Sequence, residues 1–402
     1  MGCTMRGMPQ LAAGLLAAGL GLATPAAAAD ETAEAEPKRG WSLSARYKGD
    51  VVGVATGGVA RATRYLDNID GALDADLDTL VGWRRGSAHV SLLSNTGGRP
   101  NDLAGSIQGI DNIEVSDHRV KLYEAWIEQG IGANATLRTG LYDVNSEFYA
   151  NDAAALLISP MFGVGSELAA TGVNGPAIFP STALAARLKV TTPKTYGSVA
   201  LVNARAGTIG DVGGIDFSGR EGALLIGEAG WTGSGRIAIG AWAYSQSQPT
   251  IVPPDISQGP GFHASRGAFL LAEHDLAGTP DGVHHLTGFL RLGLSEGKTT
   301  PFCGGWQSGV LLRRPFAARP ASAVLIGAGS GVLSQSYRRS NPPALPPLKS
   351  TETILEATFT DELLPGIALQ PDIQYVINPA ADRTIPNALV LGLRLTIGWT
   401  TQ

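Results

Sequence analysis

Charged, amide and indole side chains recur at alternate positions within short apolar segments, a spacing that brings them to one face of a β-strand. Arginine offers five N–H donors in a fixed plane, carboxylates accept hydrogen bonds, and amides do both. Such a face is suited to reversible hydrogen bonding with a polar molecule. The residues singled out for this role are Glu124, Arg138, Arg119, Trp126, Arg291, Glu228, Gln370, Asp372, Gln374 and Arg394.

Patterns typical of covalent or metal chemistry are weak by comparison. Ser94, and His118 beside an aspartate, stand in generic polar contexts, whereas catalysis would need a Ser–His pair or paired acids that converge. His284 and His285 are adjacent, and neighbours on a strand point to opposite faces, so they make a poor metal site. We therefore expect neither an enzyme nor a cofactor.

The elements that would position the polar residues are strands of a membrane barrel. From Trp41 onward the chain repeats units of roughly ten alternating residues, separated by breaks rich in Gly, Asn, Asp, Pro or Ser, which is typical of barrel strands. The clearest unit is 389–399, LVLGLRLTIGW, where one parity is entirely apolar and ends in Trp399, and the other holds Arg394. This pattern predicts a wall with one face in lipid and an aromatic at the interface.

Other segments carry the same alternation with local interruptions. In 367–377 the polar parity holds the two glutamines and Asp372, while Pro371 falls in the apolar parity and predicts a bulge, because proline cannot donate to the ladder. Segments 73–83 and 88–92 predict a hairpin.

The segment 119–128 is less regular than the others. Glu124 shares one parity with Trp126, Arg119 shares the other with Lys121 and Tyr123, and neither parity is purely apolar. This predicts either a bulge or a strand end that protrudes from the membrane.

The domain organisation follows from composition and length. Residues 1–29 resemble a signal peptide, with Arg6, an apolar stretch and a cleavage site of small residues before Asp30. Residues 30–40 resemble a flexible lead-in. Residues 41–402 then form one all-β, transmembrane antiparallel barrel. At about 20 to 24 residues per strand and connection, it holds about 16 strands around a water-filled lumen. The net charge of −5 gives no reason to expect nucleic acid.

The C-terminal segments resemble a known family. Residues 368–379 (ALQPDIQYVINP) and 387–394 (NALVLGLR) are similar to the C-terminal signature of the carbohydrate-selective porins, the OprB-type family. Further similar stretches, in order, are 122–129 (LYEAWIEQ), 137–143 (LRTGLYD), 147–148 (EF), 179–181 (FPS) and 289–293 (FLRLG).

The resemblance implies a sixteen-stranded channel in the outer membrane of a Gram-negative bacterium, through which mono- or oligosaccharides diffuse passively. Its partners would be the carbohydrate solute, outer-membrane lipid and the barrel assembly machinery, with association into a homo-oligomer left open. Alternatives are a channel for another small solute such as an organic acid, or a barrel enzyme or adhesin.

Within this resemblance Glu124 is the first candidate for contact with solute, because it lies in a family-like stretch, and Arg138 is the second. For each inward charge the alternative is a wall network that keeps the lumen wet and the sheet stiff.

Overall fold

The computed structural model describes residues 40–207, 215–233, 235–252, 261–279, 282, 284–339 and 347–401. The predicted signal peptide, residues 1–29, and the lead-in up to residue 39 lie outside the described residues. Everything said below concerns the described parts of the chain.

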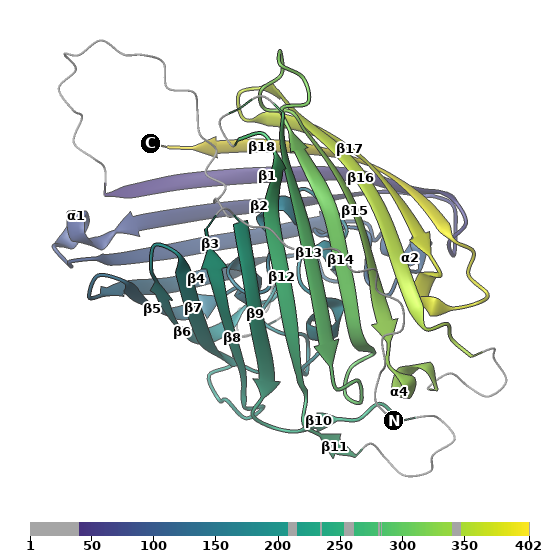
Figure 1. The fold of residues 1–402 in the computed structure, drawn as a ribbon, viewed down its shortest axis with the longest axis horizontal. Coiled ribbons are helices and arrows are strands. Elements are labelled where there is room, and N and C mark those ends of the chain that lie inside the picture. Colours follow the sequence, from purple (N-terminus) through teal and green to yellow (C-terminus); the bar gives the residue numbers. More distant parts are fainter. Residues whose placement is uncertain are drawn as a thin grey trace.

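Sixteen antiparallel strands close into one barrel (Figure 1), which confirms the predicted fold class and strand number. Each strand of the barrel pairs with the barrel strands that precede and follow it along the chain, and β1 pairs with β18. The barrel strands are β1 (Trp41–Thr56), β2 (Thr63–Asp76), β3 (Gly86–Gly97), β4 (Arg119–Ile131), β5 (Ala135–Tyr142), β6 (Ala183–Thr191), β7 (Thr195–Asn203), β8 (Ala223–Thr232), β9 (Gly235–Tyr244), β12 (Arg266–Ala277), β13 (His285–Ser295), β14 (Phe302–Arg313), β15 (Ala323–Leu333), β16 (Thr351–Leu364), β17 (Ile367–Ile377) and β18 (Ala388–Thr400).

The closing seam between β1 and β18 includes residues beyond Trp399. Thr400 pairs with Ser44, and the backbone N–H of Thr401 donates to the carbonyl of Leu43 at 2.8 Å. The Leu43 N–H in turn donates to the Thr401 hydroxyl at 2.9 Å. The residues after the terminal tryptophan therefore lengthen the pairing that closes the sheet.

Alternate residues of β18 face opposite sides of the wall, as the sequence predicts. Leu391, Leu393 and Trp399 are 49%, 43% and 56% exposed on the outer face, whereas Arg394 is only 5% exposed on the inner face. An apolar outer face and a polar inner face are expected of a barrel that stands in lipid around an aqueous interior.

The irregularity predicted in 119–128 is a β-bulge. Ser91 pairs with Glu124 but its neighbour Leu92 pairs with Leu122, so Tyr123 is an extra residue in β4. A bulge changes the parity of the strand. Lys121 and Glu124 consequently both face inward, although their positions differ by three and would lie on opposite faces of a regular strand. The two mixed parities of the sequence are explained by this one residue.

One local prediction is wrong and another is right only in part. Pro371 lies in regular register with Leu393 of β18, and it is exposed on the outer face, so no bulge forms there. The predicted hairpin forms between β2 and β3, but its first strand ends at Asp76, and α1 (Leu77–Val81) follows. The Asp76 carboxylate accepts hydrogen bonds from the N–H groups of Asp78 and Thr79, which caps the helix and competes with continued strand.

The short helices and small strands lie in the connections. They are α2 (Asn101–Ala104), η1 (Val144–Ser146), η2 (Asp152–Ala154), η3 (Pro160–Phe162), α3 (Ser166–Ala169), α4 (Gln335–Arg338), η4 (Pro379–Ala381), β10 (Gln248–Pro249) and β11 (Phe262–His263). Among the described residues, no helix is long and apolar enough to cross a membrane.

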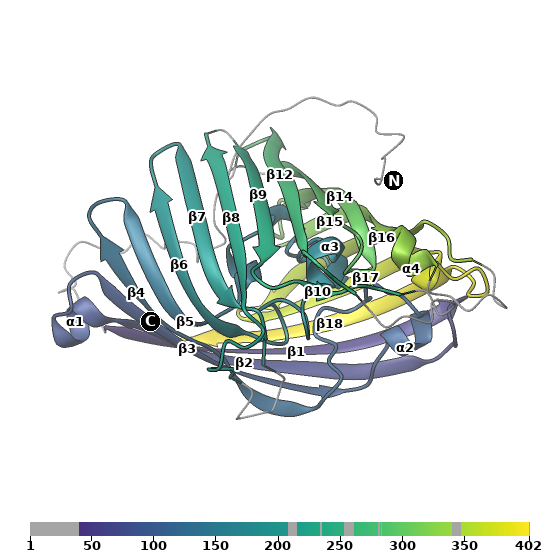
Figure 2. The same ribbon diagram turned by 90° about the horizontal axis from the view of Figure 1, so that it is seen from below.

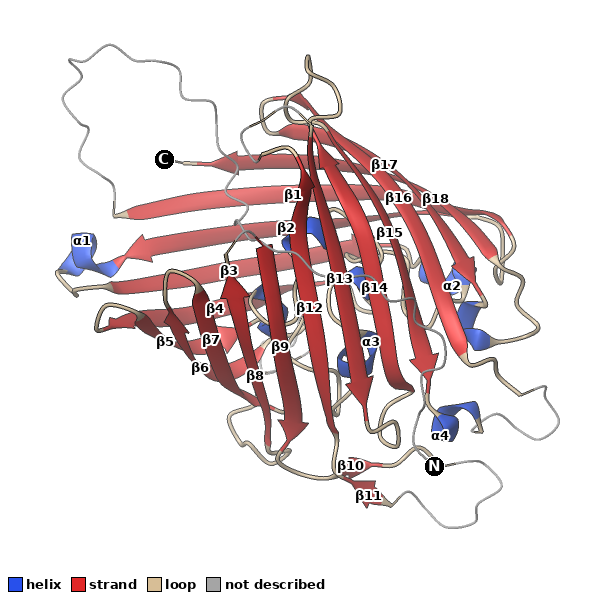
Figure 3. Cartoon of the chain, viewed as in Figure 1, coloured by secondary structure: helices blue, strands red, loops and turns tan. Residues whose placement is uncertain are grey.

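Two long connections fold into the barrel. These inserted loops are residues 98–118, between β3 and β4, and residues 143–182, between β5 and β6. Helix α3 of the second contacts β13 and β14. Figure 2 shows it inside the ring of strands, and Figure 3 shows it behind the front strands. Both inserted loops carry fully buried apolar residues, such as Ile110 and Leu168, so they pack against the wall.

Candidate functional site in the barrel lumen

Four inward glutamates of the wall hold the inserted loops by their backbone N–H groups. A carboxylate that accepts such hydrogen bonds satisfies donors that would otherwise be buried without partners. The contacts are Glu228 with Tyr149 N (2.9 Å), Glu273 with Ala153 N (3.1 Å), Glu356 with Ser159 N (3.0 Å) and with Ile158 N, and Glu352 with Ile107 N (3.0 Å) and Gln108 N (3.1 Å).

Glu228 is thus placed in a wall network. Its carboxylate also accepts from the Tyr196 hydroxyl at 2.5 Å and from Arg236 at 2.6 Å, and the side chain is 1% exposed. A solute in the lumen would meet the inserted loop before it met this carboxylate.

Arg291 lies beneath the second inserted loop. Its guanidinium donates to the carbonyls of Tyr149 at 3.0 Å and Gly163 at 2.5 Å, and also to that of Phe162. The residue is 0% exposed, so its donors are used to hold the loop backbone rather than to face solute.

Arg394 makes a bidentate ion pair with Asp50 of β1. Its Nη2 lies 2.6 Å from Asp50 Oδ2, and its Nε lies 2.9 Å from Oδ1. The same Nη2 donates to Asn112 at 2.8 Å and lies 3.5 Å from an oxygen of Asp111. Arg394 therefore joins the seam of the barrel to the first inserted loop. Burial raises the pKa of the Asp111 carboxyl well above its usual value, and the charge of Asp50 adds to that effect.

Two of the three polar candidates on β17 have the same role. Gln370 donates to the Leu156 carbonyl at 2.6 Å, and Gln374 donates to the Ile110 carbonyl at 2.9 Å and to Asp372 at 2.9 Å. All three are buried. The structure thus places five of the sequence candidates inward as anchors of loops, and Asp372 inward as a partner of Gln374. The five are Glu228, Arg291, Gln370, Gln374 and Arg394.

A second part of the inner wall remains partly accessible. We define the polar face as His89 of β3, Glu124, Trp126 and Glu128 of β4, Arg138 of β5, Arg187 of β6, and Glu147 from the second inserted loop. The side chains of Glu124 and Arg138 are each 15% exposed. The two preferred candidates from the sequence thus lie on one patch of wall.

The indole of Trp126 lies between two other side chains of the polar face. The Arg138 guanidinium carbon lies 3.7 Å from the ring centroid, and the His89 ring stacks on it with centroids 5.1 Å apart. His89 and Arg138 come from the strands on either side of β4, so both faces of the indole are covered. Trp126 Nε1 is buried without a hydrogen-bond partner among the described residues.

Acidic and basic groups alternate across the rest of the polar face. Arg187 contacts Glu128 at 2.5 Å and Glu147 at 2.6 Å, and Arg138 donates to Glu128 at 3.1 Å. Although burial opposes the shift, the Arg138 guanidinium and the Tyr142 hydroxyl hold the pKa of Glu147 below its usual value.

Sequence reasoning missed Arg187 and Glu147. Arg187 pairs directly with Arg138 across β5 and β6, and two adjacent inward arginines require carboxylates nearby. That pairing is the signal that could have found them, but it needs the strand register.

Glu124 also positions the start of the second inserted loop. Its carboxylate accepts from the backbone N–H of Asp143 at 3.0 Å, and the Tyr123 hydroxyl donates to the Asp143 carboxylate at 2.6 Å. Burial raises the pKa of Asp143 to about 7, against the hydrogen bond from Tyr123 and together with the charge of Glu124.

Two points from the sequence remain, the place of Arg119 and the question of a metal site. Arg119 begins β4, but its side chain lies outside the described residues. Within the described ranges no cluster of three or more His, Cys, Asp or Glu could hold a metal ion. His285 contacts Asp275 at 2.7 Å instead.

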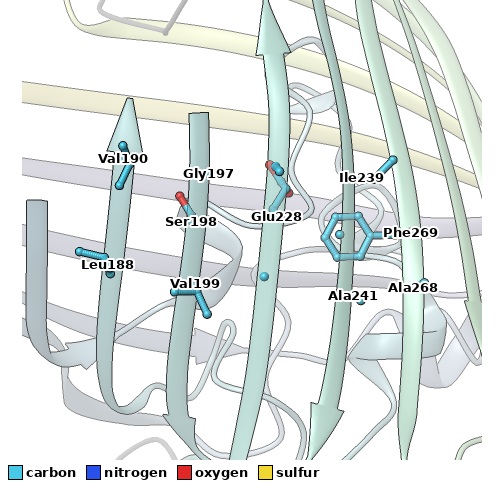
Figure 4. Close-up of a pocket in the computed structure, with 13 residues that line it drawn as sticks. Leu188, Val190, Gly197, Ser198, Val199, Glu228, Ile239, Ala241, Ala268 and Phe269 are labelled. Carbon is cyan, nitrogen blue, oxygen red and sulfur yellow. The ribbon is translucent and has the colours of Figure 1, made fainter. Parts of the chain in front are cut away.

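A recess of about 770 Å³ lies on the wall across β6 to β12 (Figure 4). Leu188, Val199 and Ile239 line it and are exposed on the outer face, while the glycines at 197, 227 and 240 thin the wall between them. Because its exposed lining is apolar and faces outward, this recess belongs to the lipid side and not to the lumen.

Comparison with known proteins decides the family. Residues 60–399 match the family model described as carbohydrate-selective porin, OprB family. The chain belongs to that family. This porin is an outer-membrane channel for carbohydrates, which confirms the function and location expected from the C-terminal resemblance.

Individual relatives are distant in sequence. The porin is 20% identical to Porin B of Pseudomonas aeruginosa, over 89% of this chain and 87% of that protein. Its fold is similar to the high pH structure of Pseudomonas putida OprB, with a TM-score of 0.79, 20% identity and coverage of 90% and 94%. Its fold is also similar to that of the outer membrane channel DcaP of Acinetobacter baumannii, with a TM-score of 0.56, 11% identity and coverage of 92% and 100%.

Proposed function

We propose that this porin passes neutral mono- and oligosaccharides by passive diffusion, and that they move along the polar face. The observation that carries the proposal is the contrast between two parts of the inner wall. Inward side chains of β12 to β18, such as Glu356 with 2% exposure, are covered by the inserted loops. Glu124 and Arg138 of the polar face remain partly accessible.

The alternation of donors and acceptors suits a polyol. A sugar hydroxyl both donates and accepts, so carboxylates from Glu124 and Glu128 and the guanidinium of Arg138 replace its water partners in turn. Because each contact also has a partner within the wall, binding is weak enough for the solute to leave.

Trp126 has a different role from a stacking platform. Both faces of its indole are covered and its Nε1–H is buried, so we expect the ring to fix the orientation of Arg138 and not to contact the solute.

The proposal contains no catalytic step, since the family and fold are those of channels. It includes three expectations from the sequence: residues 1–29 direct export and are removed, residues 30–40 form a lead-in, and residues 41–402 are the barrel domain. Insertion by the barrel assembly machinery and association into a homo-oligomer also belong to the proposal.

Liposome swelling tests the proposal. Purified porin in vesicles should admit glucose and maltose faster than amino acids and organic acids of matched size. Equal rates for sugars and size-matched solutes would contradict carbohydrate preference and leave only a general diffusion pore.

A further inference from the structure

We propose that Arg46 and Lys48 form a cationic subsite on the inner wall of β1, which binds the carboxylate of sugar acids. The inference rests on the proposed function, because it extends the solutes from neutral sugars to their acids. Arg46 and Lys48 share the inward parity with Asp50 and Val52, both of which are buried. Two residues apart on one strand, they stand about 6.6 Å from each other on one face.

Both cations lack a hydrogen bond or an ion pair with any described residue. This separates them from Arg394, Arg187, Arg138 and Arg236, all of which are paired with carboxylates. An inward charge without a partner requires water or a solute to compensate it.

The neighbours across the ladder do not neutralise the pair. On the β18 side Arg46 lies opposite Gly398 and Lys48 opposite Thr396. On the β2 side Lys48 lies opposite Asn68, and Arg46 lies opposite Asp70 without coming within ion-pair distance of it. Asp70 Oδ1 is itself buried without a partner among the described residues. Arg46, Lys48 and Asp70 together carry one net positive charge.

The pair lies where the inserted loops stop covering β1. Asp50 is 1% exposed beneath the first inserted loop, through Arg394 and Asn112. Lys48 is half-buried and Arg46 is exposed. A solute that passes the first inserted loop therefore reaches these cations.

The subsite is contiguous with the polar face. Ser44 of β1, Ala72 of β2, Ser91 of β3 and Glu124 of β4 form one row across the wall. Arg46 stands one inward position from that row. A sugar acid would present its hydroxyls to a polar wall and its carboxylate to the two cations, for which Arg and Lys donors are suited.

The test measures the zero-current potential of planar bilayers across a tenfold gradient of potassium gluconate at low ionic strength. The double variant Arg46→Gln/Lys48→Gln should lower the gluconate-to-potassium permeability ratio at least about threefold, because local cations raise the concentration of the anion. The double variant Arg46→Lys/Lys48→Arg, which exchanges the two residue types and keeps both positive charges, should retain the ratio. Lys194→Gln, at the exposed turn between β6 and β7, is the matched control outside the lumen.

Correct folding is checked by heat-modifiable mobility on gels, and the single variants Arg46→Gln and Lys48→Gln serve if the double variant does not fold. An unchanged ratio in every folded glutamine variant would overturn the subsite. Glucose swelling separates this outcome from failure of the proposed function, since glucose should still enter all of these variants. If glucose were excluded from the unaltered porin, the carbohydrate path itself would fail.

Discussion

The guanidinium carbon of Arg138 lies 3.7 Å from the centroid of the Trp126 ring. A cation over an indole is worth about 0.5–1 kcal/mol at an exposed site and about 2 kcal/mol when water is excluded. Arg138 also donates to Glu128, so its orientation is fixed by two contacts with the adjacent strand β4. It therefore presents its remaining N–H groups to the lumen in a defined direction.

Replacing Arg138 with Ala should weaken the binding of sugars and raise the conductance for small ions. The loss of a hydrogen bond to a charged group costs about 1.5–3 kcal/mol, or at least about tenfold in affinity. Block of the ion current by added glucose measures it. Arg84→Ala, in the exposed turn before β3, is the control, and equal block in both variants would show that Arg138 belongs to the wall network only.

Replacing Glu124 with Ala should alter sugar flux or single-channel conductance and leave the heat-modifiable barrel mobility intact. The reason is that Glu124 faces the lumen and also holds the N–H of Asp143. Glu124→Gln retains an acceptor for that N–H and should have a smaller effect. If conductance and flux both stay unchanged in Glu124→Ala, Glu124 belongs to the wall network and does not act on the solute.

Replacing Glu356 with Ala should free part of the second inserted loop. The backbone N–H groups of Ile158 and Ser159 lose their acceptor, which costs about 1–3 kcal/mol for each donor left unsatisfied. Single-channel records should then show larger and noisier currents. Glu362→Ala, at an exposed position of the same strand, should not raise the current noise. Equal noise in both variants would argue against anchoring of the loop by Glu356.

Replacing Arg394 with Gln should destabilise the barrel seam. Asp50 would remain buried beside Asp111 without its cation, and breaking a buried pair costs about 3–5 kcal/mol. The temperature at which the folded band disappears on gels should fall. Arg64→Gln, which removes an exposed charge near the start of β2, should not change this temperature. A matching fall in both variants would mean that the pair contributes little.

The stability of the protein should fall between pH 4 and pH 7 by an amount due to Asp143. The folded chain keeps this proton to about pH 7, whereas the unfolded chain releases it near 3.8. The folded state therefore binds more protons in this window, so the free energy of unfolding decreases as pH rises and levels off above pH 7. Asp143→Asn should reduce that slope in gel-melting temperatures measured across the window. An identical slope in the variant would assign the effect to other groups.

The strands could be predicted from sequence because lipid and lumen act on alternate residues. In β18 the alternation is complete over eleven residues, and the structure follows it. At β4 the sequence showed that the pattern breaks, but only the register with β3 locates the extra residue at Tyr123. At α1 the cap provided by Asp76 overrode the alternation.

The site was only half predictable for a related reason. Parity shows that Arg291 and Gln374 point inward, but it cannot show what lies against them. The inserted loops have no periodic pattern, and their carbonyls meet these side chains across more than a hundred residues of sequence. Contacts of that separation depend on the path of the loop and not on local spacing.

The wall glutamates hold backbone N–H groups, and every residue except proline supplies one. The backbone part of the attachment therefore does not depend on which side chains the inserted loops carry. Glu352 and Glu273 add contacts with the side chains of Ser106 and Asn151. Residues of the loops that face the solute path can be exchanged while the backbone hydrogen bonds to the wall glutamates remain. These glutamates are Glu228, Glu273, Glu352 and Glu356. The solute selectivity of such a barrel can therefore change by mutation or by engineering of the inserted loops while the strands and the anchoring glutamates stay the same.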